Sequence, residues 1–251
     1  MTFETLLLQI EERIATITIN RPTKLNALNK QVKIELASVL DTLAQDDQVA
    51  IILITGAGEK SFIAGDDIAE FKDRTKDDFK PLQEITLQIE NLRKPVIAVI
   101  NGYALGGGTE LALASDFRIA STNSKFGLPE ITLGIIPGAG GTQRLPKVIG
   151  KSKALELIMT GEIIDASTAL TLGLIDKLVS PAELMTSAIG FAKKLLQQSR
   201  FAIECAKEAV NYSTKHSVEA GLEKELDLLW KLKNTAESKQ KVEAFLKKSR
   251  K

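Results

Sequence analysis

The sequence has 251 residues, 44% of them hydrophobic, which is enough to bury a sizeable core in one large domain or in one domain with an appendage. Its 33 basic and 32 acidic residues give a net charge of +1, which argues against a wholesale nucleic-acid binder or a membrane-surface protein. The single cysteine, Cys205, excludes an internal disulfide and fits a reducing compartment.

The chain shows no pattern typical of targeting or of a membrane span. Glu4, Glu11 and Glu12 interrupt the stretch where a signal peptide would need an apolar core. No stretch approaches the roughly 20 apolar residues of a membrane-spanning helix. The sequence therefore predicts a soluble, cytoplasmic protein without a membrane partner.

Apolar periodicity predicts an α/β core in the first 150 residues. Strands and helices alternate along this part of the chain, an order that favours parallel strands with crossover connections. The expected strands are 13–19, 49–55, 95–100 and 116–120, and the expected helices are 28–44, 79–92 and a short one ending at 114. The continuous apolar runs at 49–55 and 95–100 are typical of strands buried on both faces.

The pattern changes from about residue 151, where helical spacing dominates. Only 174–179 looks like a strand in this part, and most of 200–248 is expected to be helical. We therefore predict two domains, an α/β core over 1–195 and a helical C-terminal region over 196–251 that serves assembly.

The single histidine narrows the chemistry. His216 is the only candidate for a histidine-based serine or cysteine triad, and no histidine cluster or cysteine pair is present for a zinc site. His216 itself is expected to be a solvated residue near a helix start. Any chemistry is therefore expected to use carboxylates and backbone groups, without a metal.

Three consecutive glycines in "GYALGGGTELALASD" follow a predicted buried strand and open a short helix. The run fits neither the dinucleotide fingerprint nor the P-loop pattern. It is either a tight strand-to-helix turn or a site where free N–H groups of a helix start hold an anion or oxyanion. Glu110 lies in the first turn, where the helix dipole favours an acid in any case.

Two further segments carry candidate groups. Glu130 lies among apolar residues in "FGLPEITLGIIPGAGGTQRL" and is either a surface-loop glutamate or an acid or base with a raised pKa. The later "PGAGGTQRL" is interpreted as close packing rather than catalysis. In "SFIAGDDIAEF", Asp66 and Asp67 either cap a turn or place a second N–H opposite the glycine run, which would complete an oxyanion hole.

These three segments occur in order, and together they resemble the signature segments of the crotonase superfamily, the enoyl-coenzyme A (CoA) hydratases and isomerases. "INRPTKLNAL" and "LTLGLIDKLV" strengthen the resemblance, which covers nearly the whole chain and is strongest over residues 60–180. The resemblance implies a crotonase-like α/β spiral of ββα units with a helical C-terminal trimerisation region. It also implies a homotrimer or a homohexamer built as a dimer of trimers.

The resemblance further implies an acyl-CoA thioester substrate and no separate cofactor, because CoA is part of the substrate. Carried over by position, the backbone N–H groups of Asp66 and Gly107 would hold the thioester oxygen, where negative charge develops. The other implied substrate contacts are Lys24, Leu25, Ala64, Asp67, Ile68, Ala69, Gly106, Phe245 and Lys248.

The family's hydratases use two glutamates, and Glu110 and Glu130 occupy those positions, twenty residues apart. The pair favours reversible water addition to a 2-trans-enoyl-CoA, giving a 3-hydroxyacyl-CoA, as in fatty acid β-oxidation. Glu110 would orient and deprotonate water, and Glu130 would give a proton to the α-carbon. The sequence leaves open which glutamate holds the proton, because two close carboxylates titrate as a pair.

Two positions depart from the family pattern. Asp66 stands where the family more often has a small residue, and Gln240 and Lys241 replace a frequent Glu-Gly. Phe245, Lys247 and Lys248 are therefore either contacts to the nucleotide portion or part of a solvated basic tail.

Two alternatives remain beside hydration. The first is an enoyl-CoA isomerase or another acyl-CoA enzyme of the same superfamily. The second is a non-catalytic RNA-binding relative, which would use a lysine-rich helix. The predicted helix 28–44 has only Lys30 and Lys33, balanced by Glu35 and Asp41, so no nucleic-acid partner is expected.

Overall fold

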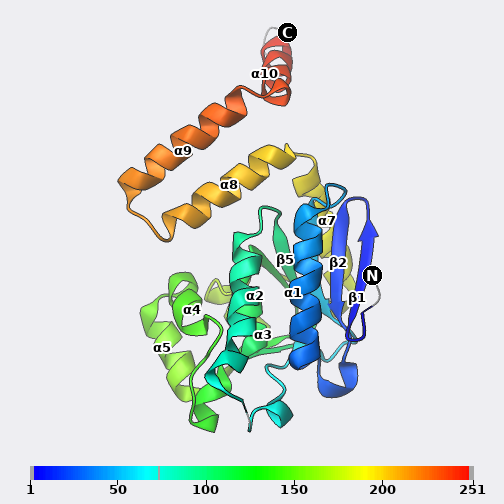
Figure 1. Ribbon diagram of the computed structural model, residues 1–251, viewed down its shortest axis with the longest axis vertical. Helices are drawn as coiled ribbons and strands as arrows, with labels where there is room; N and C mark the ends of the chain where they lie inside the picture. Colours follow the sequence, from blue (N-terminus) through cyan, green and yellow to red (C-terminus); the bar gives the residue numbers. More distant parts are fainter. Residues whose placement is uncertain (1–2, 73, 249–251) are drawn as a thin grey trace. The chain divides into compact units, whose positions relative to one another are not determined.

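The computed structural model describes residues 3–72 and 74–248. At Lys248 it describes the backbone but not the side chain. Contacts divide the chain into two compact units, Met1–Ala192 and Lys193–Lys251 (Figure 1). The first unit contains both sheets and the candidate site, and the second consists of helices. No helix in the described part of the chain is long and apolar enough to cross a membrane.

The larger sheet has six strands in the order β1-β2-β3-β5-β7-β10. Its strands are β1 (Leu6–Glu11), β2 (Ile14–Ile19), β3 (Ile51–Gly56), β5 (Val96–Ile100), β7 (Phe117–Ser121) and β10 (Lys177–Val179). β1 and β2 form an antiparallel hairpin, and the remaining neighbours are parallel. Every residue of β3 and β5 is buried, as their continuous apolar runs predicted.

Helices α1 (Lys30–Gln45) and α2 (Lys80–Asn91) pack side by side next to this sheet (Figure 1). Asn29 caps α1 by accepting a hydrogen bond from the N–H of Val32 at 3.0 Å. The apolar stripe of α1 is fully buried and comprises Val32, Leu36, Val39, Leu40 and Leu43. Both helices lie within two or three residues of the ranges expected from the sequence.

A second sheet of four short strands, in the order β4-β6-β8-β9, was not predicted. It contains β4 (Ser61–Ile63), β6 (Tyr103–Leu105), β8 (Lys125–Gly127) and β9 (Ile163–Asp165). The expectation that 174–179 is the only strand after residue 151 is wrong, because β9 pairs with β8 in antiparallel register. A strand of three residues carries too little alternation to be recognised.

Short helices complete the first unit. They are η1 (Pro22–Lys24), η2 (Ile68–Glu70), η3 (Lys76–Phe79), α3 (Gly107–Ala114), η4 (Pro129–Leu133), α4 (Gly141–Ile149), α5 (Lys151–Thr160), α6 (Ala166–Thr171) and η5 (Pro181–Glu183). α7 (Leu184–Leu196) runs across the division between the units. α3 contacts β4 and β6 of the second sheet and also contacts α2. It therefore lies between the second sheet and the layer formed by α1 and α2.

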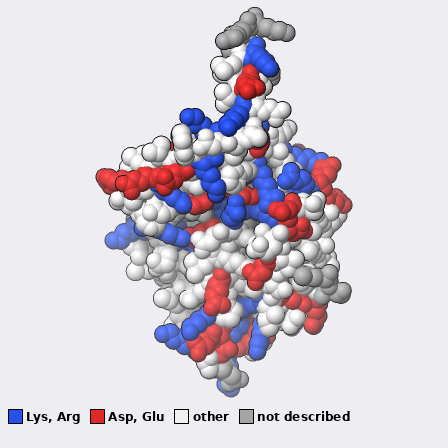
Figure 2. Space-filling view, turned by 45° about the horizontal axis from the view of Figure 1, so that its top comes forward, with Lys and Arg blue, Asp and Glu red and all other residues white. Residues whose placement is uncertain are grey.

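The second unit contains α8 (Arg200–Ser213), α9 (Val218–Lys233) and α10 (Ala236–Lys248). α8 and α9 pack against each other, and Lys224 pairs with Glu208 at 2.5 Å. One stripe of α9 is nevertheless exposed and apolar: Val218, Leu222, Leu226, Leu229 and Trp230. On the face of the molecule shown in Figure 2, Lys and Arg are interspersed with Asp and Glu.

Candidate active site

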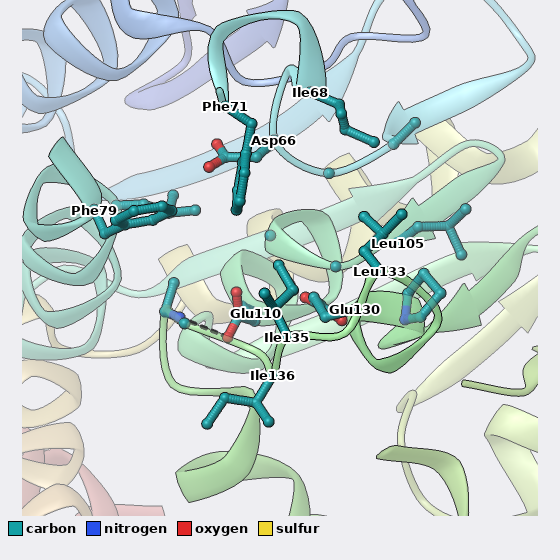
Figure 3. A pocket seen from close by; sticks show the side chains of 18 of the residues that line it. Asp66, Ile68, Phe71, Phe79, Leu105, Glu110, Glu130, Leu133, Ile135 and Ile136 are labelled. Carbon is teal, nitrogen blue, oxygen red and sulfur yellow. Dashed lines mark hydrogen bonds between the residues drawn. The ribbon is translucent and has the colours of Figure 1, made fainter. Parts of the chain in front are cut away.

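The first unit contains a cavity of about 280 Å³, whose wall is mostly apolar (Figure 3). The loop after β4, the start of α3, η4 and the loop before α4 all contribute to it. Seven of the candidate residues line this cavity: Ala64, Asp66, Ile68, Gly106, Gly107, Glu110 and Glu130. Segments separated by up to about seventy positions in the chain therefore meet at one place.

The three glycines make the strand-to-helix turn compact. Gly106, the N-cap of α3, has a φ of 50°, a backbone conformation that residues with a side chain rarely adopt. A Cβ on Gly108 would lie 2.1 Å from the carbonyl oxygen of Ile63, so only glycine fits against β4. The Thr109 hydroxyl contacts the carbonyl oxygens of Ala104 and Gly127 at 2.6 and 2.9 Å and ties the turn to β6 and β8.

The backbones of Asp66 and Gly107 come close together at this turn. The N–H of Leu28 donates to the carbonyl of Gly65, and the carbonyl of Leu28 accepts a hydrogen bond from the N–H of Asp67. Because this bridge uses the residues on either side of Asp66, the N–H of Asp66 faces away from Leu28. A Cβ on Gly107 would lie 3.8 Å from the nitrogen of Asp66, so the two backbones face each other closely. Gly107 is the first residue of α3, where N–H groups lack intrahelical partners. The two N–H groups are therefore close enough to be candidates for a shared oxyanion hole.

Glu110 is held from one side by the loop before α4. Its Oε1 accepts hydrogen bonds from the N–H groups of Ala139 at 2.7 Å and Gly141 at 2.8 Å, and its side chain is buried (Figure 3). Burial raises the pKa of Glu110, while the two N–H donors act in the opposite direction by favouring the carboxylate. The second carboxyl oxygen remains available to the cavity.

Glu130 occupies a different environment on η4. Its Oε2 is buried and finds no hydrogen-bond partner among the described residues. Burial raises the pKa of Glu130 to about 7, and the negative charges of Glu110 and Asp66 add to the shift. A carboxyl group in this setting is protonated in a large share of molecules at neutral pH, so it can donate a proton.

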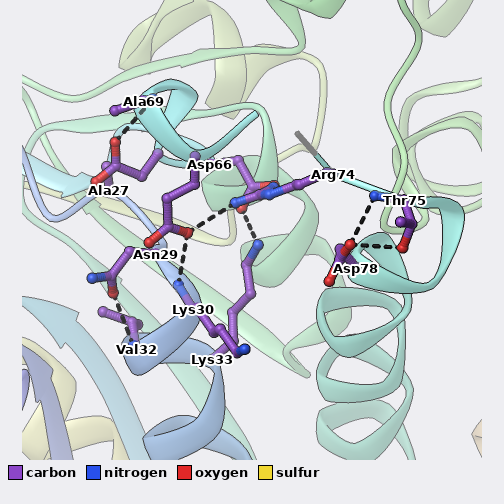
Figure 4. Close-up of polar contacts among 12 residues, drawn as sticks. Ala27, Asn29, Lys30, Val32, Lys33, Asp66, Ala69, Arg74, Thr75 and Asp78 are labelled. Carbon is purple, nitrogen blue, oxygen red and sulfur yellow. Dashed lines mark hydrogen bonds and ion pairs between the residues drawn. The ribbon is translucent and has the colours of Figure 1, made fainter. Parts of the chain in front are cut away.

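Asp66 carries its carboxylate at the edge of the cavity, where two cations hold it (Figure 4). Its Oδ1 lies 2.6 Å from Nζ of Lys33 on α1, and its Oδ2 lies 2.5 Å from Nη1 of Arg74. Arg74 also contacts Glu70 at 3.2 Å. The guanidinium lies 5.6 and 5.7 Å from the ring centroids of Phe71 and Phe79, which line the cavity.

A family model described as Enoyl-CoA hydratase/isomerase matches residues 9–251. The chain belongs to this enoyl-CoA hydratase/isomerase family. The "Short-chain-enoyl-CoA hydratase" of Clostridium acetobutylicum is 40% identical, with 99% of this chain and 97% of that protein covered. The "Crotonyl-CoA hydratase" of Syntrophomonas wolfei is 39% identical with the same coverage.

Solved structures of the enoyl-CoA hydratase/isomerase family share the architecture. The crystal structure of enoyl-CoA hydratase from Bacillus anthracis superposes with a TM-score of 0.94 at 36% identity, covering 98% of this chain and 97% of that one. The expected crotonase-like fold is therefore confirmed.

Several candidate contacts carried over from the family lie outside the cavity wall. Lys24 and Leu25 end η1, and Leu25 has a left-handed φ of 49°. The carboxylate of Asp67 instead contacts Arg21 at 3.1 Å and caps η2 through the N–H of Ala69. Phe245 lies exposed on α10 in the second unit. The side chain of Lys248 lies outside the described residues.

The close packing expected of "PGAGGTQRL" is present, since a Cβ on Gly141 would lie 2.9 Å from side-chain atoms of Leu128 and Pro137. The same loop also donates the N–H groups of Ala139 and Gly141 to Glu110, which the sequence did not predict. Sequence reasoning missed these donors since a backbone N–H leaves no signal in the residue type. It also missed the aromatic wall of Phe71 and Phe79, whose rings meet edge to face with centroids 5.2 Å apart. The pairing of Lys33 with Asp66 was likewise missed, because it joins a helix to a distant loop.

Proposed function

We propose that the protein is an enoyl-CoA hydratase that adds water reversibly to a 2-trans-enoyl-CoA. The observation that carries this proposal is the pairing of a buried glutamate, Glu110, with a half-buried one, Glu130, in unlike environments on one apolar cavity that the backbones of Asp66 and Gly107 also line. Addition of water needs a base for the water and an acid for the α-carbon. The cavity supplies both, together with donors for the thioester oxygen.

In hydration, the water oxygen bonds to C3 while the free oxygen of Glu110 accepts a water proton. Electron density moves to the thioester oxygen, which the N–H groups of Asp66 and Gly107 stabilise. Glu130 then gives its proton to C2, and the product is the 3-hydroxyacyl thioester. Proton exchange returns Glu110 to the carboxylate and Glu130 to the acid. In dehydration the two roles exchange.

The assignment of roles follows from the surroundings of each carboxyl group. Two N–H donors on one oxygen of Glu110 stabilise its ionised form, which a base requires. The raised pKa of Glu130, about 7, keeps a proton available for the α-carbon. The two carboxyl groups are coupled, and we propose that Glu130 carries the proton that the pair shares.

The substrate class we propose is a short, unbranched enoyl-CoA. Ile68, Phe71, Phe79 and Leu82 form an apolar wall suited to an acyl chain, and the cavity of about 280 Å³ is small for a long one. Two full-length relatives carry the printed names crotonyl-CoA hydratase and short-chain-enoyl-CoA hydratase. The reaction needs no cofactor beyond the CoA that arrives with the substrate.

The experiment that tests this function follows the conjugated enoyl absorbance of crotonyl-CoA, which disappears as water adds. We expect turnover with crotonyl-CoA and a decline of kcat/KM as the acyl chain lengthens. Absorbance that does not change with any 2-enoyl-CoA would refute hydration. Turnover of a 3-enoyl-CoA without hydration of the 2-enoyl isomer would identify an isomerase instead.

We also propose that the helical unit mediates assembly into trimers or hexamers and that the protein acts in the cytoplasm. The exposed apolar stripe of α9, which includes Leu222, Leu226 and Trp230, supports assembly because such stripes are normally covered. The chain has a single cysteine, Cys205, and so cannot form an internal disulfide, which supports a reducing compartment. Sedimentation analysis measures the assembly, and a monomer at micromolar concentration would contradict it.

A further inference from the structure

The carboxylate of Asp66 presents an electrostatic problem for the proposed oxyanion hole. The residue donates its backbone N–H toward the site where negative charge develops, yet its own side chain is an anion on the same cavity. The charge is felt across the cavity, since it raises the pKa of both Glu110 and Glu130. Uncompensated, this charge would oppose a second negative charge on the thioester oxygen.

Two buried cations face this carboxylate from different elements. The side chain of Lys33 is 5% exposed and that of Arg74 is 7% exposed, and each contacts a different oxygen of Asp66. Buried lysine and arginine side chains are costly to desolvate, so both are expected to remain paired. Lys33 anchors the carboxylate to α1, and Arg74 anchors it to the segment before η3.

The surrounding contacts give the cluster a defined geometry. Arg74 also binds Glu70, whose Oε2 accepts a hydrogen bond from the N–H of Lys30 at the start of α1 (Figure 4). Asp67, the next residue along the loop, pairs with Arg21. The two positive charges of Lys33 and Arg74 are thus balanced by Asp66 and Glu70, and the loop that carries the donor N–H is tied down at successive residues.

We propose that Lys33 and Arg74 are positioning residues of the thioester site, which cancel the charge of the Asp66 carboxylate and fix the loop whose N–H holds the thioester oxygen. This inference rests on the proposed function. In this arrangement the aspartate side chain is an anchor, and only its backbone touches the substrate. The carboxylate contacts Lys33 on α1 and Arg74, while the backbone nitrogen of Asp66 lies near Gly107.

The test combines removal of a cation with removal of the anion. We expect Lys33→Met to lower kcat about tenfold, below the roughly 100- to 1,000-fold loss that follows removal of an oxyanion donor, with little change in KM. Asp66→Ala in the Lys33→Met background should restore most of kcat, because it removes the unbalanced charge and keeps the backbone N–H. Lys30→Met removes an exposed lysine charge from the same helix and should leave kcat unchanged.

Rescue by the second substitution distinguishes charge compensation from packing. If Lys33 only fills space, adding Asp66→Ala should lower kcat further. A double variant whose kcat is no higher than that of Lys33→Met overturns the inference. Wild-type kcat in Lys33→Met would also overturn it. Should Lys33→Met fail to fold, Arg74→Gln and its combination with Asp66→Ala provide the same comparison with the same outcomes.

A binding measurement separates this inference from the proposed reaction. Butyryl-CoA labelled with carbon-13 at the thioester carbonyl is saturated and cannot be hydrated, and donors on its oxygen lower the carbonyl stretching frequency. We expect a smaller shift in Lys33→Met than in the wild type and recovery in the double variant. A wild type that shifts the carbonyl but does not hydrate crotonyl-CoA would refute the proposed reaction alone. Equal shifts in all variants would refute the role of Lys33.

Discussion

Glu110 and Glu130 are the same residue type on the same cavity, yet their surroundings differ in the property that decides their chemistry. One oxygen of Glu110 accepts two backbone N–H groups from the loop before α4. Glu130 has a buried oxygen without a partner among the described residues. Hydrogen-bond donors stabilise a carboxylate, whereas their absence in a buried setting favours the protonated acid. The backbone around each side chain therefore distinguishes the two carboxyl groups, as the proposed division into base and acid requires.

The largest expected effect comes from replacing either glutamate with glutamine. Glu110→Gln keeps an oxygen for the N–H groups of Ala139 and Gly141 but cannot accept a water proton, and Glu130→Gln keeps the shape but cannot supply a proton. Each substitution is expected to lower kcat for crotonyl-CoA by about 100- to 10,000-fold. Thermal unfolding serves as the control for folding. Turnover within tenfold of wild type in either variant would contradict the two-carboxyl assignment.

The second expected effect is on stability and concerns Glu130. Its pKa is raised from 4.5 to about 7 in the folded state, so the folded protein retains a proton that the unfolded chain has released. The stability of the wild type should therefore fall as pH rises from about 4.5 to about 7 and then level off. Glu130→Gln lacks this loss and should be more stable than wild type above pH 7 by about 1 to 3 kcal/mol.

Urea unfolding at several pH values measures this difference. If the difference in the free energy of unfolding between Glu130→Gln and wild type stays constant from acid to alkaline pH, Glu130 ionises normally in the folded protein. Such a result would remove the contrast between the two glutamates.

The third expected effect is on the pH dependence of hydration. Glu130 must be protonated to act as the acid, and its pKa is about 7, so the rate should decline as pH rises through this value. Above it, kcat/KM for hydration of crotonyl-CoA is expected to fall about tenfold for each pH unit. Initial rates from about pH 5 to about pH 9 measure the profile. A flat profile over the alkaline half would exclude Glu130 as the proton donor.

Long patterns in the sequence predicted their elements well, whereas short ones did not. The apolar stripe of α1 and the continuous runs of β3 and β5 are long enough to show a period, and they appear within a few residues of the expected bounds. β4, β6, β8 and β9 have three residues each and form a sheet only because distant parts of the chain meet. Their pairing depends on tertiary context that no local window contains.

The candidate site likewise contains groups that the sequence could predict and groups that it could not. Glu110 and Glu130 are side chains in distinctive segments, so a single sequence is enough to nominate them. The groups that set their environments are of another kind: the N–H groups of Ala139 and Gly141 depend on the path of the backbone rather than on residue identity. Lys33 follows the helical pattern of α1, and nothing in its neighbours indicates that it meets Asp66. Reactive groups were predictable, whereas their electrostatic setting required the fold.

The smallest expected effect concerns the support of Glu110 and leaves Glu130 untouched. The Thr86 hydroxyl on α2 lies 2.9 Å from the carbonyl oxygen of Ala139, whose N–H binds Glu110, and Thr86 is buried. Thr86→Val keeps the shape and removes this hydrogen bond, which is worth about 0.5 to 1.5 kcal/mol and corresponds to a loss of about two- to tenfold in kcat. The alkaline decline of the rate should stay near pH 7, because burial and the charges of Glu110 and Asp66 raise the pKa of Glu130, without a contribution from Thr86.

Thr171→Val is the matched control, since Thr171 on α6 bonds an exposed carbonyl one helical turn earlier and should leave kcat unchanged. If Thr86→Val lowers kcat and also moves the alkaline decline, the two glutamates share one support. If it lowers kcat alone, the loop before α4 acts on Glu110 alone. We expect the second result, because the described contacts connect this loop to Glu110 through the N–H groups of Ala139 and Gly141.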